Sequence, residues 1–353
     1  MAPDLDRPSG GIKVIYGYAE HLAALGYDAR VWHGTPGFRF SGLVSDARVD
    51  TGLRLPFEPG DVLVIPETGG STWSFLAEDN PVVVLCQGID FVFADVDFDT
   101  VVPGGYPGWP RAVAALATSV AIAEFLDRAC EPGFPVHAVP VEIEERFRPL
   151  EKERRIALMP RRRREDLLGV VQILRRGGHL SDWDVTLIDG MTSEEVAEAL
   201  GRAAIFLSGA EREGFGLPGA EAMAAGCYVV GFTGNGAKEY MLPDCSSVVP
   251  DSDVVAMADL TLEAMRLFDE DRPALQAKVD TGRARIHERY GAAGVRAALG
   301  DAFSVLTAEG SPALFTQSVT LPHYQAHAPK GGVAGAAYRG LRHTARRIVG
   351  PKD

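Results

Sequence analysis

Residues 211–226 read EREGFGLPGAEAMAAG, and this stretch decides how the rest of the chain is interpreted. It follows the apolar run AIFLS at residues 204–208, which is typical of a buried strand. Pro218 suits the first residue of a helix, because its fixed φ is helical and its missing N–H costs nothing there. Gly226 then ends that helix. The pattern predicts a strand, a glycine-rich turn over residues 214–217 and a helix of small residues.

Two carboxylates flank this predicted turn. Glu213 precedes it, and Glu221 lies about one helical turn inside the helix. Glycines allow the turn backbone to approach a ligand, and N–H groups at a helix start attract anions and hydroxyl oxygens. Carboxylates accept hydrogen bonds from vicinal hydroxyls, so the stretch predicts a site for a hydroxyl-rich ligand at the carboxyl end of a strand. The plainer alternatives are a loop surface acid for Glu213 and a helix-start acid for Glu221.

Further apolar runs alternate with helical patterns along the chain. The runs are rich in Val, Ile and Leu, which favours strands buried on both faces of parallel sheets; they are DVLVI (61–65), PVVVLC (81–86), RIALM (155–159), DVTLI (184–188) and YVVGF (228–232). One intervening helical pattern is SEEVAEALGRA, with Ser193 as its expected N-cap. The alternation predicts an α/β fold with right-handed crossovers.

The length of 353 residues favours two domains. A boundary is expected in VHAVPVEIEERFRPLEKERR, which holds two prolines and a charge run before a new strand. We predict doubly wound, Rossmann-like domains at residues 1–140 and 141–300. A helix and basic tail are expected at residues 301–353, and a return of this segment to the first domain is one alternative. Only nine residues precede the glycine turn Gly10-Gly11, so the first strand is expected to be short or missing.

The net charge of −13 argues against nonspecific binding to nucleic acid. The start MAPDLDRPSGG lacks a signal-peptide pattern, and no apolar run is long enough to span a bilayer. The four cysteines have no metal-like spacing and are expected to be reduced. These features predict a cytoplasmic protein. The basic residues after Ser311 leave two alternatives for the tail, a solvated segment or peripheral contact with the inner face of the membrane.

EGFGLPGAEAMAAG, followed by YVVGFTGNGAKEYM, resembles the donor-site signature of retaining GT-B glycosyltransferases of group 1, also called family four. Their hallmark is a Glu, seven residues and a second Glu. The resemblance is dense over residues 208–241. It is looser but collinear in PSGGIKVIYGYAEHLAALGYDARV and in MPRRRREDLL. It implies a GT-B fold, in which two Rossmann-like domains face each other across a cleft.

The resemblance also implies a substrate and residue roles. A nucleotide-diphosphate sugar would be the donor, with no other cofactor and no obligatory metal. Glu213 would be the catalytic residue beside the transferred sugar, and Glu221 would hold the ribose hydroxyls. The remaining donor-binding candidates are the amides of Phe215, Gly216 and Leu217, the diphosphate-binding Arg161 and Arg163, and Gly10, Gly11 and Gln87 from across the cleft. Gln87 stands where relatives often have His, and an amide cannot shuttle a proton as His can.

The predicted activity is therefore that of a retaining hexosyltransferase. It would move a sugar to a hydroxyl of a carbohydrate or lipid-linked acceptor in cell-surface polysaccharide or glycoconjugate synthesis. A glycosidase would also present two carboxylates, but the amide turn and basic cluster favour an anionic leaving group. Two alternatives stay open at this point, a non-catalytic sugar-nucleotide-binding subunit and a GT-B sugar-nucleotide epimerase.

Overall fold

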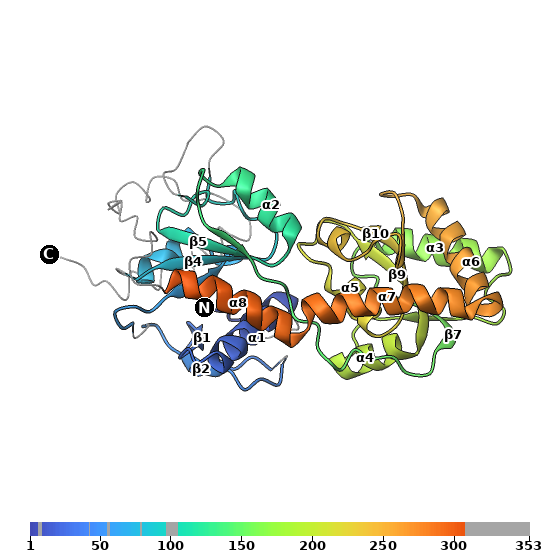
Figure 1. The fold of residues 1–353 in the computed structure, drawn as a ribbon, viewed down its shortest axis with the longest axis horizontal. Coiled ribbons are helices and arrows are strands. Elements are labelled where there is room, and N and C mark those ends of the chain that lie inside the picture. Colours follow the sequence, from blue (N-terminus) through green and yellow to red (C-terminus); the bar gives the residue numbers. More distant parts are fainter. Residues whose placement is uncertain (6–8, 42, 55–56, 78–79, 97–104, 308–353) are drawn as a thin grey trace.

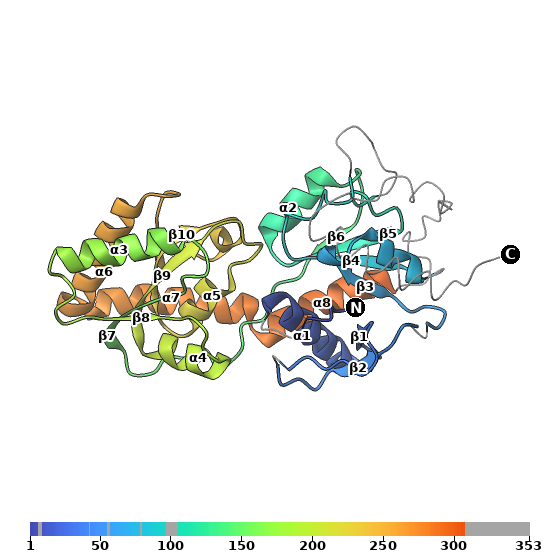
Figure 2. The same ribbon diagram turned by 180° about the vertical axis from the view of Figure 1, so that it is seen from behind.

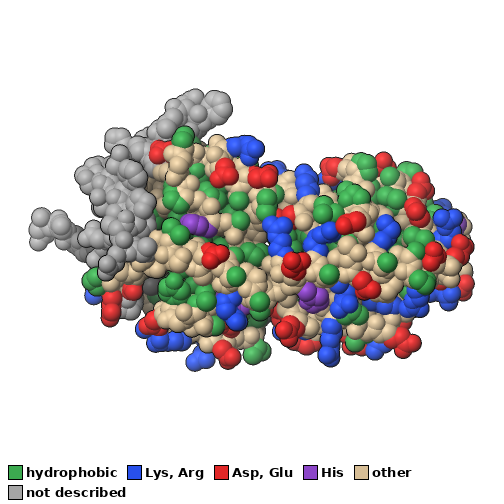
Figure 3. Space-filling view, viewed as in Figure 1, with side chains coloured by type: hydrophobic (Ala, Val, Ile, Leu, Met, Phe, Trp, Pro, Cys, Tyr) green, Lys and Arg blue, Asp and Glu red, His purple; other side chains and the backbone are tan. Residues whose placement is uncertain are grey.

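The computed structural model describes residues 1–5, 9–41, 43–54, 57–77, 80–96 and 105–307, and the basic tail lies outside these residues. The described chain forms two lobes that lie side by side (Figure 1). Charged side chains of both signs are interspersed over the face that carries helices α7 and α8 (Figure 3). Within the described ranges, no helix is long and apolar enough to cross a membrane.

The N-terminal lobe contains the first ten elements of the chain. In order they are α1 (Gly10–Ala24), β1 (Arg30–His33), β2 (Arg48–Thr51), β3 (Leu63–Pro66), the 3-10 turns η1 (Glu67–Gly69) and η2 (Ser71–Ala77), β4 (Val82–Cys86), β5 (Ala112–Ala117), α2 (Val120–Ala129) and β6 (Val136–Ala138). Strands β3, β4, β5 and β6 form a parallel sheet in that order, and β1 pairs with β2 in parallel.

Residues 1–5 bridge these two sheets without forming a strand. The Ala2 N–H donates to the Trp32 carbonyl of β1 at 2.9 Å, and the Met1 nitrogen donates to the Val64 carbonyl of β3 at 2.8 Å. With this segment between them, the spatial order of chain segments matches that of a doubly wound dinucleotide-binding sheet. The short or missing first strand expected from the sequence is thus replaced by two backbone contacts.

The C-terminal lobe contains most of the later elements. In order they are β7 (Glu153–Leu158), α3 (Arg164–Arg176), β8 (Asp184–Leu187), α4 (Ser193–Arg202), β9 (Ala203–Ala210), α5 (Leu217–Ala224), β10 (Tyr228–Thr233), the 3-10 turn η3 (Gly236–Glu239), β11 (Ser246–Val248), α6 (Val254–Glu270) and α7 (Arg272–Tyr290). The sheet is parallel throughout, in the order β11-β10-β9-β7-β8. Helices α3 and α6 pack together, as do α4, α5 and α7.

The last described helix, α8 (Ala292–Leu306), crosses back to the N-terminal lobe and packs against α1 (Figures 1 and 2). Its Phe303 ring lies 5.7 Å from that of Tyr27. The chain therefore passes between the lobes twice, once between β6 and β7 and once at Gly291. The predicted boundary at residue 140 falls in the first crossing, whereas residue 300 lies inside α8. The exact division into domains stays a prediction.

All six apolar runs are strands, as the sequence predicts. Strands β1, β2, β5, β6 and β11 were not predicted from the sequence. The residues of β5 read AVAALA, and alanine favours helices over strands. The expected N-cap Ser193 is wrong by one residue. Thr192 caps α4, and its hydroxyl accepts from the Glu195 N–H while the Glu195 carboxylate accepts from the Thr192 N–H.

Helix α5 begins at Leu217, one residue before the predicted start, so Pro218 is its second residue. It ends as predicted at Gly226, which has φ +80°. The Gly226 and Cys227 N–H groups donate to the carbonyls of Met223 and Ala222, an arrangement that satisfies the last helix carbonyls. The buried ammonium of Lys152 accompanies this end, and it donates to the Ala225 carbonyl at 2.7 Å.

Candidate functional site

The β9–α5 turn, residues 211–216, lies at the carboxyl end of the central strand of the C-terminal sheet. Gly216 has φ +87°, and its carbonyl accepts from the Tyr240 hydroxyl. The Phe215 ring is buried against the rings of Tyr240 and Tyr290, at 5.3 and 4.9 Å between centroids. This anchoring fixes the backbone just before α5, where N–H groups lack intrahelical acceptors. The turn therefore presents amides at a helix start.

Neighbouring backbone packs closely against this turn on two sides. A Cβ on Gly214 would lie 2.0 Å from the Gln87 carbonyl oxygen of the N-terminal lobe. A Cβ on Gly236 would lie 2.1 Å from the Gly214 carbonyl oxygen, and the Gly236 N–H donates to the Glu213 carbonyl at 3.1 Å. Any larger residue at these positions would push main chain apart. The glycines in the sequence motif are therefore needed for contact between backbones.

The Glu213 carboxylate lies close to Arg161 and to the β9–α5 turn. Its side chain is 16% exposed, and Oε1 lies 3.9 Å from Nη2 of Arg161. Burial raises the pKa of Glu213, while the charges of Arg161 and Arg162 oppose the increase. Oε2 lies 3.6 Å from where a Cβ on Gly216 would stand, so the side chain lies over the turn.

Glu221 projects from α5 into an environment with several cations. Burial raises its pKa to about 7, against the opposing charges of Lys13, Arg146 and Arg161. The charge of Arg161 opposes the increase in pKa at both carboxylates. The roles of Glu213 and Glu221 stay predictions.

A small hollow opens at the carboxyl ends of β7 and β9. Its polar lining comes from the basic turn after β7 and from the β9–α5 turn, and includes Arg161, Arg162, Ser208, Glu213 and Gly216. Arg161 is 70% exposed and has room to reorient toward a ligand. Cations and a helix start around one hollow can hold an anionic group.

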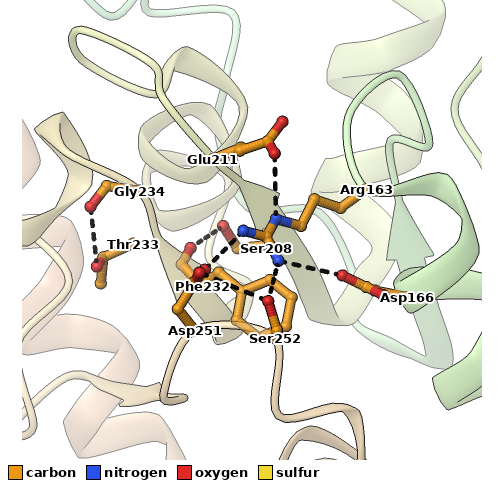
Figure 4. A network of polar contacts seen from close by, with 9 residues as sticks. All are labelled: Arg163, Asp166, Ser208, Glu211, Phe232, Thr233, Gly234, Asp251 and Ser252. Carbon is orange, nitrogen blue, oxygen red and sulfur yellow. Dashed lines mark hydrogen bonds and ion pairs between the residues drawn. The ribbon is translucent and has the colours of Figure 1, made fainter.

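Arg163 occupies a different environment from the one the sequence predicts (Figure 4). Its side chain is only 14% exposed and pairs with Asp251 at 2.7 Å and with Asp166 at 3.3 Å. It also donates to the Ser252 hydroxyl at 2.7 Å and lies over the Phe232 ring, 5.1 Å from its centroid. This guanidinium ties the β7–α3 turn to the loop before α6. Arg162, which was not singled out from the run of four arginines, lines the hollow with Arg161.

The predicted residues of the N-terminal lobe meet the same turn from across the interface. A Cβ on Gly10 would lie 2.9 Å from Cδ1 of Leu217, so the start of α1 touches the start of α5. Gln87 donates through Nε2 to the Gly11 carbonyl at 3.2 Å, and its own carbonyl packs against Gly214. Gln87 therefore links the glycine turn of one lobe to the glycine turn of the other.

Lys13 is a functional candidate that sequence reasoning missed. Its ammonium crosses between the lobes to the Ser193 hydroxyl at 3.0 Å and lies 3.8 Å from Glu144. It is also the largest favourable charge acting on Glu221. Its position two residues after Gly10-Gly11, at the start of a helix, was the available signal. A lone lysine in that position has no distinctive pattern, so only the fold reveals its role.

His33 lies in the interior of the N-terminal lobe. His33 is buried between the Tyr16 hydroxyl, 2.8 Å from Nε2, and Asp4, 3.0 Å from Nδ1. Burial lowers its pKa, and the cluster connects α1, β1 and the initial segment. Over the described part of the chain, no group of three or more His, Cys, Asp or Glu residues is arranged to hold a metal ion.

Comparisons with known proteins bear on this geometry. Residues 162–266, which include both carboxylates, η3 and most of the lining of the hollow, match the family model "Glycosyl transferases group 1". The matched residues all lie in the C-terminal lobe. An alpha-1,6-glucosyltransferase of Actinobacillus pleuropneumoniae serotype 7 (strain AP76) is 32% identical over 166 residues, which are 44% of this chain. The match covers 49% of that protein, so the chain matches about half the length of this relative.

Solved structures show the same two-lobed fold, which is GT-B. A sucrose-phosphate synthase from Thermosynechococcus elongatus superposes with TM-score 0.62 at 14% identity, covering 84% of this chain and 94% of that one. The structure of Anabaena HepE in complex with UDP and glucose superposes with TM-score 0.63 at 12% identity, and the match covers 85% of this chain and 97% of that one. A glycosyltransferase from Rickettsia africae ESF-5 superposes with TM-score 0.58 at 12% identity, and the match covers 86% of this chain and 96% of that one. At these identities the likeness establishes the fold alone.

Proposed function

We propose that this protein transfers a sugar from a nucleotide-diphosphate sugar to an acceptor hydroxyl, with retention of anomeric configuration. The observation that carries the proposal is the hollow at the β9–α5 turn, where Glu213 and two arginines surround the start of α5. This arrangement suits a ligand with hydroxyls at one end and an anionic leaving group at the other.

Each side chain has a role in the proposed reaction. Glu221 accepts hydrogen bonds from the ribose hydroxyls, and these bonds are stronger to its ionised form. Glu213 orients the transferred sugar and stabilises positive charge that develops at its anomeric carbon. The amides of Phe215, Gly216 and Leu217 donate to sugar oxygens.

The leaving group is stabilised from both lobes. Arg161 and Arg162 face the hollow and can pair with the diphosphate. Gly10 and Gly11 supply the start of α1 from the opposite side, beside Leu217. Arg163 acts indirectly, because its ion pairs fix the turn that carries the other two arginines.

In the proposed chemistry, the bond between the anomeric carbon and the diphosphate oxygen breaks first. The acceptor hydroxyl oxygen then bonds to the same face of the sugar, and its proton passes to the departing diphosphate oxygen. No protein base is needed, which agrees with a neutral Gln87 at this interface. The retaining course and a role in cell-surface polysaccharide or glycoconjugate synthesis come from the family resemblance.

The test combines binding with turnover. Thermal-shift screening of UDP, GDP, ADP and their sugars should reveal one stabilising nucleotide, since a ligand that binds only the folded state raises the melting temperature. UDP-glucose is the first donor to try, because the HepE structure holds UDP and glucose and the Actinobacillus relative is named a glucosyltransferase. Turnover is then measured with carbohydrate and lipid-linked acceptors, and proton NMR of the product reports the anomeric configuration.

Three outcomes would count against parts of this proposal. An inverted product would exclude retention while leaving transfer intact. Donor binding without turnover for any acceptor would favour a non-catalytic binding subunit. No stabilisation by any nucleoside diphosphate or its sugars would remove the proposed donor site.

A further inference from the structure

Glu239 forms a polar link between the lobes that no proposed catalytic role explains. It ends η3, the 3-10 turn that follows β10. Its Oε2 accepts from the N–H of Val120, the first residue of α2 in the N-terminal lobe, at 2.7 Å. Its Oε1 accepts from the hydroxyl of Tyr290, the last residue of α7, at 2.7 Å. One carboxylate therefore joins three elements from both lobes.

The chemistry of the α2 start suits this contact. The first N–H groups of a helix have no intrahelical acceptor and carry partial positive charge. The Ser119 hydroxyl of the same lobe accepts from the Ile122 N–H at 3.1 Å. The Val120 N–H is instead satisfied by a carboxylate from the other lobe, through a short, charge-assisted bond.

The same link is rigidly connected to the β9–α5 turn. Gly236, at the start of η3, packs against the backbone of Gly214 and Phe215. The Tyr290 ring is fully buried and packs against the Phe215 ring at 4.9 Å. The Tyr290 carbonyl also accepts from Ile143, in the segment that crosses between the lobes, at 2.8 Å. A shift at Glu239 would thus be felt at both the turn and the crossing.

A second polar contact between the lobes is much weaker. Arg212, on the β9–α5 turn, pairs with Asp90 at 2.8 Å, but the two side chains are 71% and 46% exposed. Exposed pairs of this kind contribute little to stability. The half-buried Glu239, with two short bonds and a buried partner, is better placed to hold the lobes in register.

We propose that Glu239 is an interlobe positioning residue, which holds the start of α2 against η3 and α7 and keeps the two lobes in the arrangement that the structure shows. This structural role does not depend on the proposed function. Only an effect of Glu239 on catalysis would rest on the proposed function. Loss of the carboxylate leaves the Val120 N–H without this acceptor and loosens the contact between the lobes.

The primary experiment uses the full chain without ligand. Hydrogen exchange is measured at the Val120 amide, and small-angle X-ray scattering gives the radius of gyration, for wild type, Glu239→Ala and Glu288→Ala. Glu288 is an exposed acid that lines a surface cavity together with Val120 and Glu239, so its removal matches the change in charge. Glu239→Ala should speed exchange at Val120 about tenfold, the factor expected for one charge-assisted bond, and should enlarge the radius of gyration. Glu288→Ala should do neither.

Two further variants keep the test decisive if Glu239→Ala folds poorly. Glu239→Gln keeps one carbonyl acceptor for Val120 and can donate to the Tyr290 oxygen, so it should restore most of the protection. Tyr290→Phe keeps the ring and removes only the hydroxyl, so it should cause a smaller increase in exchange. Amides of β9 should exchange unchanged in every variant, which separates local opening from global unfolding.

Unchanged exchange at Val120 in Glu239→Ala, or equal effects of Glu239→Ala and Glu288→Ala, would overturn the proposal. The structural readouts need no donor sugar. A wild-type protein that binds no nucleotide would therefore contradict the proposed function without affecting this test.

Discussion

Both lobes contain parallel sheets, but only the C-terminal lobe has its described strands in a single sheet. The C-terminal sheet is continuous, with β9 in its centre and the β9–α5 turn at its end. The N-terminal lobe divides its strands between two sheets, bridged by the backbone of Met1 and Ala2. The family match lies entirely in the C-terminal lobe. In the proposed reaction, the lobe with the continuous sheet is therefore the one that carries Glu213, Glu221 and the amides of the β9–α5 turn.

The largest expected effect tests the donor side of this comparison. Glu213→Ala should lower turnover by about 10²–10³-fold, because a carboxylate that stabilises transition-state charge is lost from a partly buried site. The measurement is nucleotide release with the donor found by thermal shift. Glu211→Ala removes a neighbouring acid that is 42% exposed and serves as the matched control. Equal turnover in wild type and Glu213→Ala would contradict the catalytic assignment.

A second prediction concerns pH and the ribose-binding role. Because the pKa of Glu221 is about 7, the ionised acceptor form is lost as pH falls through 7. Nucleotide affinity should fall about tenfold per pH unit below 7 and stay level above it. The charges that act on this carboxylate are those of Lys13, Glu144, Arg146 and Arg161.

Calorimetry from pH 5.5 to 8.5 measures this profile. Glu221→Gln should bind roughly 10–100-fold more weakly at pH 8, since hydrogen bonds to a charged group are lost, and its affinity should no longer vary through pH 7. A wild-type affinity that stays constant from pH 5.5 to 8.5 would remove Glu221 from the donor site.

The sequence predicted the C-terminal lobe better than the N-terminal lobe for physical reasons. The runs that form β9 and β10 are apolar and continuous, and Gly226 ends α5 because only a turn with positive φ fits there. The alanine-rich β5 has no such signal. Likewise, the sequence could not distinguish Arg162 from Arg163 in a run of four arginines, because their directions depend on the backbone of the β7–α3 turn.

A third prediction distinguishes the exposed Arg161 from the ion-paired Arg163. Arg161→Ala should weaken nucleotide binding about tenfold and leave the free energy of unfolding nearly unchanged, because the side chain is 70% exposed. Arg163→Ala should instead lower the free energy of unfolding by about 1–2 kcal/mol, since its bonds to Asp251 and Ser252 tie two loops together. Calorimetry and denaturant unfolding measure the two effects, and the reverse pattern would exchange the assigned roles.

The smallest effect is expected at the exposed interlobe pair. Arg212→Ala and Asp90→Ala, with the double variant, should give a coupling energy below about 1 kcal/mol, because both side chains are largely solvated. Denaturant unfolding at 0.05 and 0.5 M salt measures the coupling, which should shrink as ionic strength rises. A coupling of several kcal/mol would mean that this pair, rather than buried contacts, holds the lobes together.

The return of α8 to the first lobe sets an order of events during synthesis. Val295, Leu299 and Phe303 belong to the same buried cluster as Ile12 and Tyr18 of α1. Because the ribosome synthesises the chain from its amino end, α1 is made well before α8, the helix against which it packs. The half that emerges first therefore completes its interior last, after the other half has had time to fold.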